Sequence, residues 1–201
     1  MATSAVVGGK VTAAIFNELV DAVNSVGLIR VVPTSVSGSG VTVATTGLVT
    51  FTSATEINVN GCFTSAWRNY RIVCESTGTA GNHIVNLRDG TTNITTGYDR
   101  TENLSRNGTT SSSTSLNGSG WGVMGLSNTL VQWDMEISAP QLAVATTGLS
   151  RGGSHSNPAV SNTSNGLTLN YLTHRTATAY DGLRLIIGAA QTGTLQVYGY
   201  N

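Results

Sequence analysis

The chain has 201 residues and a formal net charge of zero, and charged residues make up only 10% of it, against about a quarter in a typical globular domain. This balance excludes the basic surface that binding to nucleic acid or to an anionic membrane would need. Because 39% of the residues are hydrophobic, the low charge does not indicate disorder. Thr, Ser, Asn and Gly supply the polar residues, a mixture typical of short strands joined by tight turns.

Targeting and disulfide signals are weak. Residues 1–9 contain no basic region followed by an apolar run, so we expect no signal peptide, and no apolar run approaches the ~18 residues of a membrane span. The two cysteines are Cys62 and Cys74. Cys74 lies in an apolar strand phase and is expected to be a small core residue, while a bond between the two stays open.

Residues 1–36 are expected to form an attachment segment and a short helical stem. Thr12 offers an N-cap hydroxyl and Gly27 a stop, and between them the apolar residues recur at helical spacing: Ile15, Phe16, Leu19, Ala22, Val23 and Val26. At ~1.5 Å per residue this helix is only about 22 Å long, too short to be stable alone in water. It must pack on its own domain or on copies of itself.

Residues 37–201 are expected to form a β-sandwich head. The clearest strand is Leu130–Ser138, in which alternation places Val131, Trp133, Met135 and Ile137 on one apolar face. Asn69–Ser76 alternates in the same way, with Tyr70, Ile72 and Cys74 on one face. Further short runs favour strands at 41–43, 48–51, 56–59, 83–88, 94–98, 121–126, 166–174, 182–187 and 193–200.

The absence of helical patterns between these runs predicts an antiparallel sandwich. In 166–174, Leu167, Leu169 and Tyr171 share the apolar phase. The polar stretches 101–120 and 150–166 are expected to be exposed loops. The hexapeptide Val-Ala-Thr-Thr-Gly-Leu occurs at 43–48 and again at 144–149, and we interpret it as the same turn used twice.

No catalytic constellation emerges. Gly148–Gly152 matches G-x-S-x-G, but that chemistry needs a strand-to-helix elbow, and a polar loop is expected here instead. His83, His155 and His174 lack metal-ligand spacing. We therefore expect no metal, no cofactor and no enzymatic activity.

A carbohydrate site is one reading of the aromatic residues near expected loops. An aromatic face stacks on a sugar ring while polar side chains bind its hydroxyls. The candidate surface contacts are Tyr98, Asp99, Arg100 and Trp121. The alternative is that Tyr98 and Trp121 cap the ends of the sandwich.

Several phrases suggest a family. The segment 61–73, Gly-Cys-Phe-Thr-Ser-Ala-Trp-Arg-Asn-Tyr-Arg-Ile-Val, resembles one that recurs in virion fibre and minor tail proteins of tailed bacteriophages, with Cys62 and Trp67 as variations. Residues 97–100, 193–200 and the stem start at 12–17 with Val23-Asn24 look similar to the same group. The resemblance implies an N-terminal part that attaches to the particle and a trimeric, outward-facing jelly-roll domain, and it supplies no catalytic residues.

These observations lead to one expected function and its rivals. We expect a structural virion protein, a homotrimeric fibre or spike that contacts other virion proteins through residues 1–30 and the host surface through its head. A host-surface glycan is the candidate ligand of the head. The open alternatives are a capsid decoration or vertex protein without receptor binding, a carbohydrate-binding or carbohydrate-active tail module, and a free lectin. Location at the surface of the virion, on tail or capsid, follows from the resemblance.

Overall fold

The computed structural model describes residues 27–78, 81–106, 109–124, 130–155 and 166–201. These residues are mainly β, as predicted, and they contain no helix. The expected stem lies outside them, in residues 1–26, with all six of its apolar positions: Ile15, Phe16, Leu19, Ala22, Val23 and Val26.

The described residues form fourteen strands. In chain order these are β1 Ile29–Arg30, β2 Ser35–Ser37, β3 Val41–Val43, β4 Val49–Asn60, β5 Asn69–Gly78, β6 His83–Asp89, β7 Thr92–Asn93, β8 Tyr98–Arg106, β9 Thr109–Gly118, β10 Trp121–Met124, β11 Leu130–Ser138, β12 Thr146–His155, β13 Gly166–His174 and β14 Gly182–Tyr200. Several expected runs merge, since 48–51 and 56–59 both belong to β4, and 182–187 and 193–200 both belong to β14.

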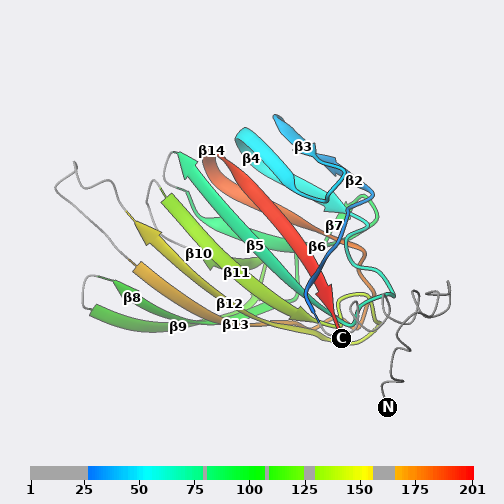
Figure 1. The fold of residues 1–201 in the computed structure, drawn as a ribbon. Coiled ribbons are helices and arrows are strands. Elements are labelled where there is room, and N and C mark those ends of the chain that lie inside the picture. Colours follow the sequence, from blue (N-terminus) through cyan, green and yellow to red (C-terminus); the bar gives the residue numbers. More distant parts are fainter. Residues whose placement is uncertain (1–26, 79–80, 107–108, 125–129, 156–165) are drawn as a thin grey trace, which may run out of the picture.

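All strands join one sheet through antiparallel pairs (Figure 1). The main order is β10-β6-β14-β5-β11-β12-β13-β8-β9, and β4 adds to β14 while carrying β2 and β3. β1 pairs with the last residues of β14, so β structure begins at Ile29, before the boundary expected at residue 37. The predicted strand Leu130–Ser138 is β11 and lies in the middle of this order.

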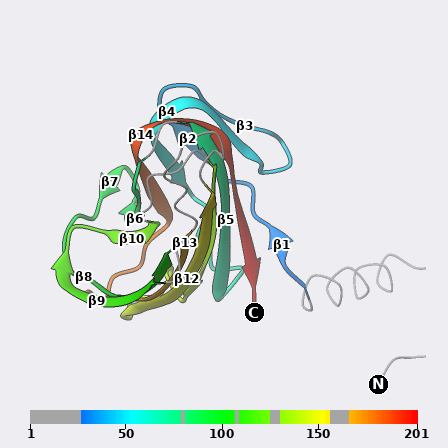
Figure 2. The ribbon, with the colours of Figure 1, turned by 90° about the vertical axis from the view of Figure 1, so that its left-hand side faces the viewer.

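The sheet curls because two long strands bend. The first part of β14 pairs with β6 and its second part with β5, and the register against β4 shifts between Ile186 and Gln191. β4 bends opposite this point, where Ser53 has a φ of 50°. The curl brings β10 across from β11, β12, β13 and β8, so the two ends of the sheet enclose a common core (Figure 2).

Large and small side chains are matched across this core. Trp121, Val123 and Met124 of β10 are buried, while the residues of β12 that face them are small, among them Ser150 and Gly152. Alternating large and small residues lets facing strands approach closely. On β11 the predicted face is confirmed, because Val131, Trp133, Met135 and Ile137 are all buried.

Strand β13 reverses the expected orientation. Its range is as predicted, but Thr168, Asn170 and His174 face the core, and Leu167 and Tyr171 are 60% and 56% exposed. The polar residues are tolerated inside because they find partners: Asn170 Nδ2 donates to Ser150 Oγ at 2.9 Å, and a ring nitrogen of His174 lies 2.9 Å from the Thr96 carbonyl oxygen. The consequence is an apolar ridge on the outside of the sheet.

The polar stretch 101–120, which we expected to be a loop, is largely strand, because residues 98–106 and 109–118 pair with each other as β8 and β9. Of the second expected loop, 150–166, residues 150–155 belong to β12, Gly166 begins β13, and the others lie outside the described residues. Thr and Ser tolerate extended backbone well when a neighbouring strand supplies the ladder. The repeated hexapeptide also differs, since 44–47 form a turn with Gly47 at a φ of 82°, whereas Thr146–Leu149 lie inside β12.

The cysteines are both free and buried. Cys74 is a core residue of β5, as predicted, and no bond joins it to Cys62. Burial raises the pKa of both thiols, so neither is a reactive thiolate.

The sheet has two distinct ends. Ile29 lies opposite Gly199, and Asn69 lies opposite both Tyr200 and Ser138, so the described chain enters the sheet at the end where β14 finishes, the near end (Figure 2). At the opposite, far end, Leu130 lies opposite His155 and Gly166 opposite Arg106. The strand ends Gly78, Arg106, His155 and Gly166 therefore all lie at the far end.

Candidate functional site

The aromatic residues proposed for sugar stacking are core residues. Tyr98 is 1% exposed and Trp121 is fully buried, so neither can stack on a surface ligand, and that prediction is wrong for both. Their polar atoms are satisfied internally: the Leu87 N–H donates to Tyr98 Oη at 2.7 Å, and Trp121 Nε1–H donates to the Thr173 carbonyl at 3.1 Å. Their rings lie 5.2 Å apart in an edge-to-face arrangement, which is the packing expected of a core.

The polar partners proposed beside them point to opposite faces of β8. Asp99 lies on the outside, where Arg175 binds it and lowers the pKa of its carboxyl group. Arg100 lies on the inner side, where Nη1 donates to the Gly122 carbonyl at 3.1 Å and Nη2 is 3.3 Å from Glu102 Oε2. Successive side chains of a strand point to opposite faces of the sheet, so the four candidates form no single site.

The G-x-S-x-G motif carries no nucleophile. Gly148–Gly152 lies within β12, and Ser150 is fully buried with Asn170 Nδ2 donating to its hydroxyl. His83 and His174 are each buried in separate contacts, with Trp133 and Tyr180 respectively. In the part of the chain that the structure describes, no three or more His, Cys, Asp or Glu side chains gather into a potential metal site.

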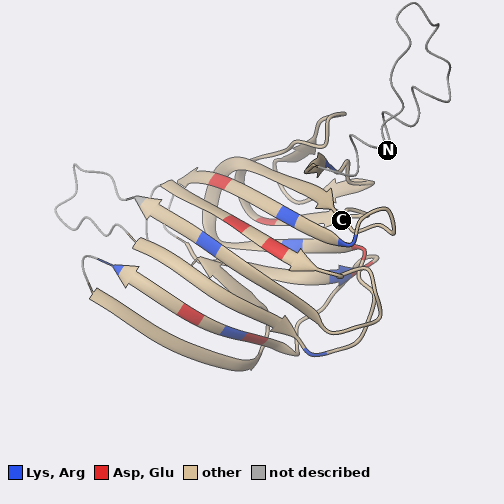
Figure 3. Ribbon diagram, turned by 60° about the horizontal axis from the view of Figure 1, so that its bottom comes forward, with Lys and Arg blue, Asp and Glu red and all other residues tan. Residues whose placement is uncertain are grey.

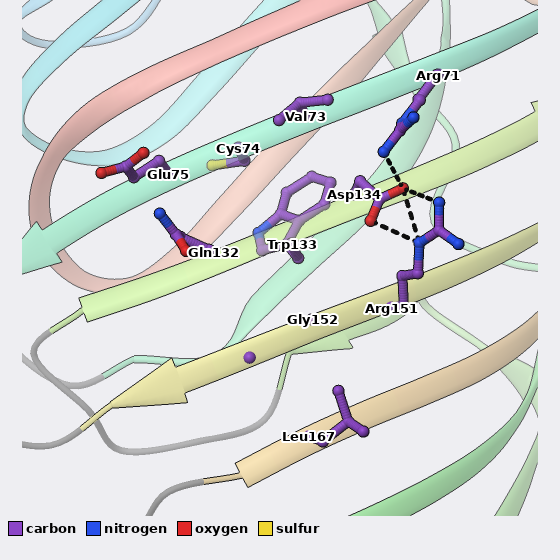
Figure 4. A pocket seen from close by; sticks show the side chains of 11 residues that line it. Arg71, Val73, Cys74, Glu75, Gln132, Trp133, Asp134, Arg151, Gly152 and Leu167 are labelled. Carbon is purple, nitrogen blue, oxygen red and sulfur yellow. Dashed lines mark hydrogen bonds and ion pairs between the residues drawn. The ribbon is translucent and has the colours of Figure 1, made fainter.

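A shallow groove on the outside of the sheet is a better candidate (Figure 4). It has a volume of about 370 Å³ and crosses β5, β11, β12 and the start of β13. Cross-strand neighbours explain its shape, because the row Glu75, Gln132, Gly153, Leu167 contains one residue without a side chain. Gly153 therefore forms the floor, and we call this depression the outer-face groove.

One side of the outer-face groove is a charged cluster. Arg151 donates two hydrogen bonds to Asp134, from Nε to Oδ1 at 2.9 Å and from Nη2 to Oδ2 at 3.0 Å. Arg71 Nη2 lies 3.1 Å from the same Oδ2 (Figure 4). Two guanidinium groups on one carboxylate fix its position through charge-assisted hydrogen bonds.

The remaining walls combine apolar and uncharged surface. Leu167 lies beside Gly153 on the neighbouring strand, and Val73 lies on β5 beside Asp134. Figure 4 shows Glu75 and Gln132 together at the end away from the charged cluster. Within the described residues, neither Glu75 nor Gln132 uses its side chain in an ion pair or a hydrogen bond to another side chain. Their polar atoms are therefore available to a ligand.

This groove is not apparent from the sequence. The alternation in Leu130–Ser138 leaves Gln132 and Asp134 on the polar face of that strand, but Arg151 and Gly153 fall in a stretch expected to be a loop. The reversed face of β13 also hid Leu167, which was expected to point into the core. The usable signal was the Gly152-Gly153 pair in a strand, since glycine in a strand marks a close approach or a gap.

These two glycines give a stability prediction. A Cβ on Gly152 would lie 2.8 Å from the Trp133 Cβ atom and 3.1 Å from the Gln132 carbonyl oxygen. We expect Gly152→Ala to lower the free energy of unfolding by about 1–3 kcal/mol, as overpacking of a core does. Gly153→Ala is the control, because its Cβ would meet only the Gly166 carbonyl oxygen at 3.9 Å. Urea unfolding of both variants measures this, and equal losses would contradict it.

Among the residues that the structure describes, none forms a helix with the length and hydrophobicity that crossing a membrane requires. Comparison of the chain with profiles of known protein families found no match, and neither did comparison with curated proteins. The geometry of the sheet and of its outer-face groove is therefore the basis for proposing a function.

Proposed function

We propose that this protein is a structural component of a phage virion, a homotrimeric fibre or spike whose N-terminal segment attaches to the particle. The curled sheet serves as its head, in which the two facing parts act as the layers of a jelly-roll-like sandwich. Contact with the host surface is the role of the head. The protein acts as a binding and structural element and not as an enzyme.

The observation that supports this most is which strand ends lie at each end of the sheet. Ile29, where the described strands begin, lies at the near end, while Gly78, Arg106, His155 and Gly166 lie at the far end. A head held by its N-terminal segment would therefore turn the far end, where these strands are connected, away from the particle. Recognition residues are commonly carried on such connections over a rigid scaffold.

The surface chemistry fits this role. The sheet carries few charges, and those on its broad face lie among neighbours of opposite sign (Figure 3). Asp134 of β11 has both carboxylate oxygens bound by arginines. This favours a structural role for this carboxylate over a glycosidase pair, in which both carboxyl groups face the scissile bond.

A trimer gives a direct test. The chain has a mass of 20.8 kDa, and we expect a solution mass of three chains from light scattering. Leu19→Asp would place a charge in the expected stem and should shift this mass toward one chain while the sheet stays folded by circular dichroism. Leu116→Asp is the control, because Leu116 is 66% exposed on β9. A wild-type chain that is monomeric at micromolar concentration would overturn the trimeric fibre.

A further inference from the structure

The outer-face groove carries the inference. We infer that it binds a neutral saccharide unit of a host-surface glycan, which rests on the proposed function and names the ligand of the head. Its volume, about 370 Å³, falls at the small end of the range of roughly 300–1,000 Å³ that is typical of small-molecule sites. This is room for one or two sugar rings and not for a folded partner.

The charges lining the groove argue for a neutral ligand. Two guanidinium groups, on Arg71 and Arg151, are matched by two carboxylates, on Glu75 and Asp134. Three of these four groups bind one another, and so the arginines are not free to attract an anion. A neutral molecule enters without breaking these ion pairs, whereas an acidic one would have to compete with Asp134.

The uncharged features match sugar hydroxyls. A hydroxyl both donates and accepts, and the groove presents a carboxylate acceptor on Glu75 and an amide that does both on Gln132. Arg151 engages Asp134 through Nε and Nη2, which leaves Nη1 to donate. These groups come from three neighbouring strands, so the sheet holds them in place before the ligand arrives.

The apolar walls complete the match. Leu167 is the cross-strand neighbour of Gly153 and is exposed although it is a large hydrophobic residue, and Val73 lines the groove from β5, beside Asp134. An exposed leucine beside polar side chains is typical of an interaction site. Here it would contact the C–H face of a pyranose ring while the hydroxyls meet Glu75 and Gln132. A groove this shallow implies weak binding by one chain, which three linked copies would strengthen.

The groove lies toward the far end of the sheet. Leu167 follows the first residue of β13, and Gln132 and Gly153 lie within two residues of Leu130 and His155, the far-end pair. In a particle-anchored head this is the end that meets the host. The site is thus placed where the proposed function needs it.

An NMR titration of the full-length chain tests the inference. The probes are neutral di- and trisaccharides of N-acetylglucosamine, galactose, glucose and rhamnose, with sialyllactose and an oligogalacturonate as acidic comparisons. We expect amide shift changes at β11, β12 and the start of β13 with at least one neutral probe. Gly153→Val should weaken that binding at least tenfold, since it fills the floor at a position where an added Cβ has open space.

Two further variants give the comparison. Gln132→Ala should also weaken binding, and Thr114→Val on β9 should not, because Thr114 lies on the outside of the sheet away from the groove. The inference is overturned if no neutral probe binds at tens of millimolar, if only acidic probes bind, or if Gly153→Val binds as the wild type does. If those outcomes occur but the protein is a trimer that adsorbs to host cells, the proposed function stands without the groove as its site. If the protein is a monomer that binds sugars in the groove, the saccharide site stands and the trimeric fibre does not.

Discussion

Trp121→Ala should lower the free energy of unfolding by about 3–5 kcal/mol, the range for removing a large aromatic residue from a core. Trp121 has no exposed surface, and truncation would remove its hydrogen bond to the Thr173 carbonyl and its packing against Tyr98. Through these contacts Trp121 ties β10 to β8 and β13. The loss is measured by urea unfolding, followed by tryptophan fluorescence and circular dichroism.

Two matched variants keep this prediction testable if Trp121→Ala does not fold. Trp121→Phe keeps an aromatic ring and should lose less, mainly the hydrogen bond and part of the buried area. Leu116→Ala, at a 66% exposed position, should change the free energy of unfolding by no more than about 0.5 kcal/mol. A loss below 1 kcal/mol for Trp121→Ala would mean that the side chain lies at the surface, which is the first of the two alternatives that the sequence left open.

Acidification should destabilise the protein through His83. Trp133 Nε1–H donates to Nδ1 of His83 at 2.8 Å, and the indole nitrogen is only a donor. Nδ1 must therefore carry no proton, which leaves Nε2–H to donate to Gln191 Oε1 at 2.9 Å. A second proton on this ring would point at the indole N–H, so burial and this geometry favour the neutral form.

The sign of the effect follows from the pKa. Burial lowers the pKa of His83 below its ordinary value of 6.5, so the unfolded chain binds the proton more readily than the folded one. The stabilisation is fully present above pH 6.5 and is lost as the pH falls below it, by up to about 1.4 kcal/mol per pH unit until the folded pKa is reached. Urea midpoints between pH 4.5 and 8 measure this slope.

A second variant isolates the histidine. Trp133→Phe removes the donor facing Nδ1 and should raise the pKa of His83, which flattens the pH slope even though the overall stability falls. Nitrogen NMR of the ring should show the Nε2–H tautomer in the wild type at neutral pH. Titration of His83 at or above pH 6.5 in the folded protein would contradict the argument.

The alternation of apolar and polar residues in the sequence predicted the strands whose buried faces are apolar. β5 and β11 fall where the sequence placed them, with Tyr70, Ile72 and Cys74 inward on one and Trp133 and Met135 inward on the other. These strands lie in the centre of the sheet and face large side chains across the core. In these two strands the hydrophobic residues are also the buried ones, so the sequence alone is enough to predict the buried face.

The alternation of apolar and polar residues did not predict which side chains are buried where contacts with distant strands decide the buried face. β13 buries Thr168, Asn170 and His174 because their polar atoms find partners inside. Thr168 and Asn170 bond to Met124 and Val123 of β10, and His174 bonds to the Thr96 carbonyl. The same hexapeptide turns at 44–47 and is extended at 146–149, because β11 and β13 flank only the second copy. A local sequence does not carry these neighbours, so neither outcome was predictable from it.

The candidate site could not be predicted from the sequence for a related reason. The polar stretches around Tyr98 and Trp121 favour loops, so the sequence makes these aromatic residues candidates for surface contacts. In the structure β8 and β9 pair beside them, and the curl of the sheet covers both rings. The outer-face groove instead depends on a missing side chain at Gly153 and on the reversed face of β13. Both are properties of the assembled sheet and not of any one segment.

The long bent strand β14 has a consequence for how the chain is made. Its two halves hold β4, β5 and β6 together, and none of those three strands pairs directly with another of them. While the ribosome is still adding residues before 182, these strands have no common partner and their edges stay open. Folding therefore has to wait for almost the whole of this polypeptide, and such distant pairings close slowly, in milliseconds to seconds. A cell producing the protein would have to shield the nascent edges until β14 arrives, and a message truncated before residue 182 would yield aggregation-prone material and not a smaller domain.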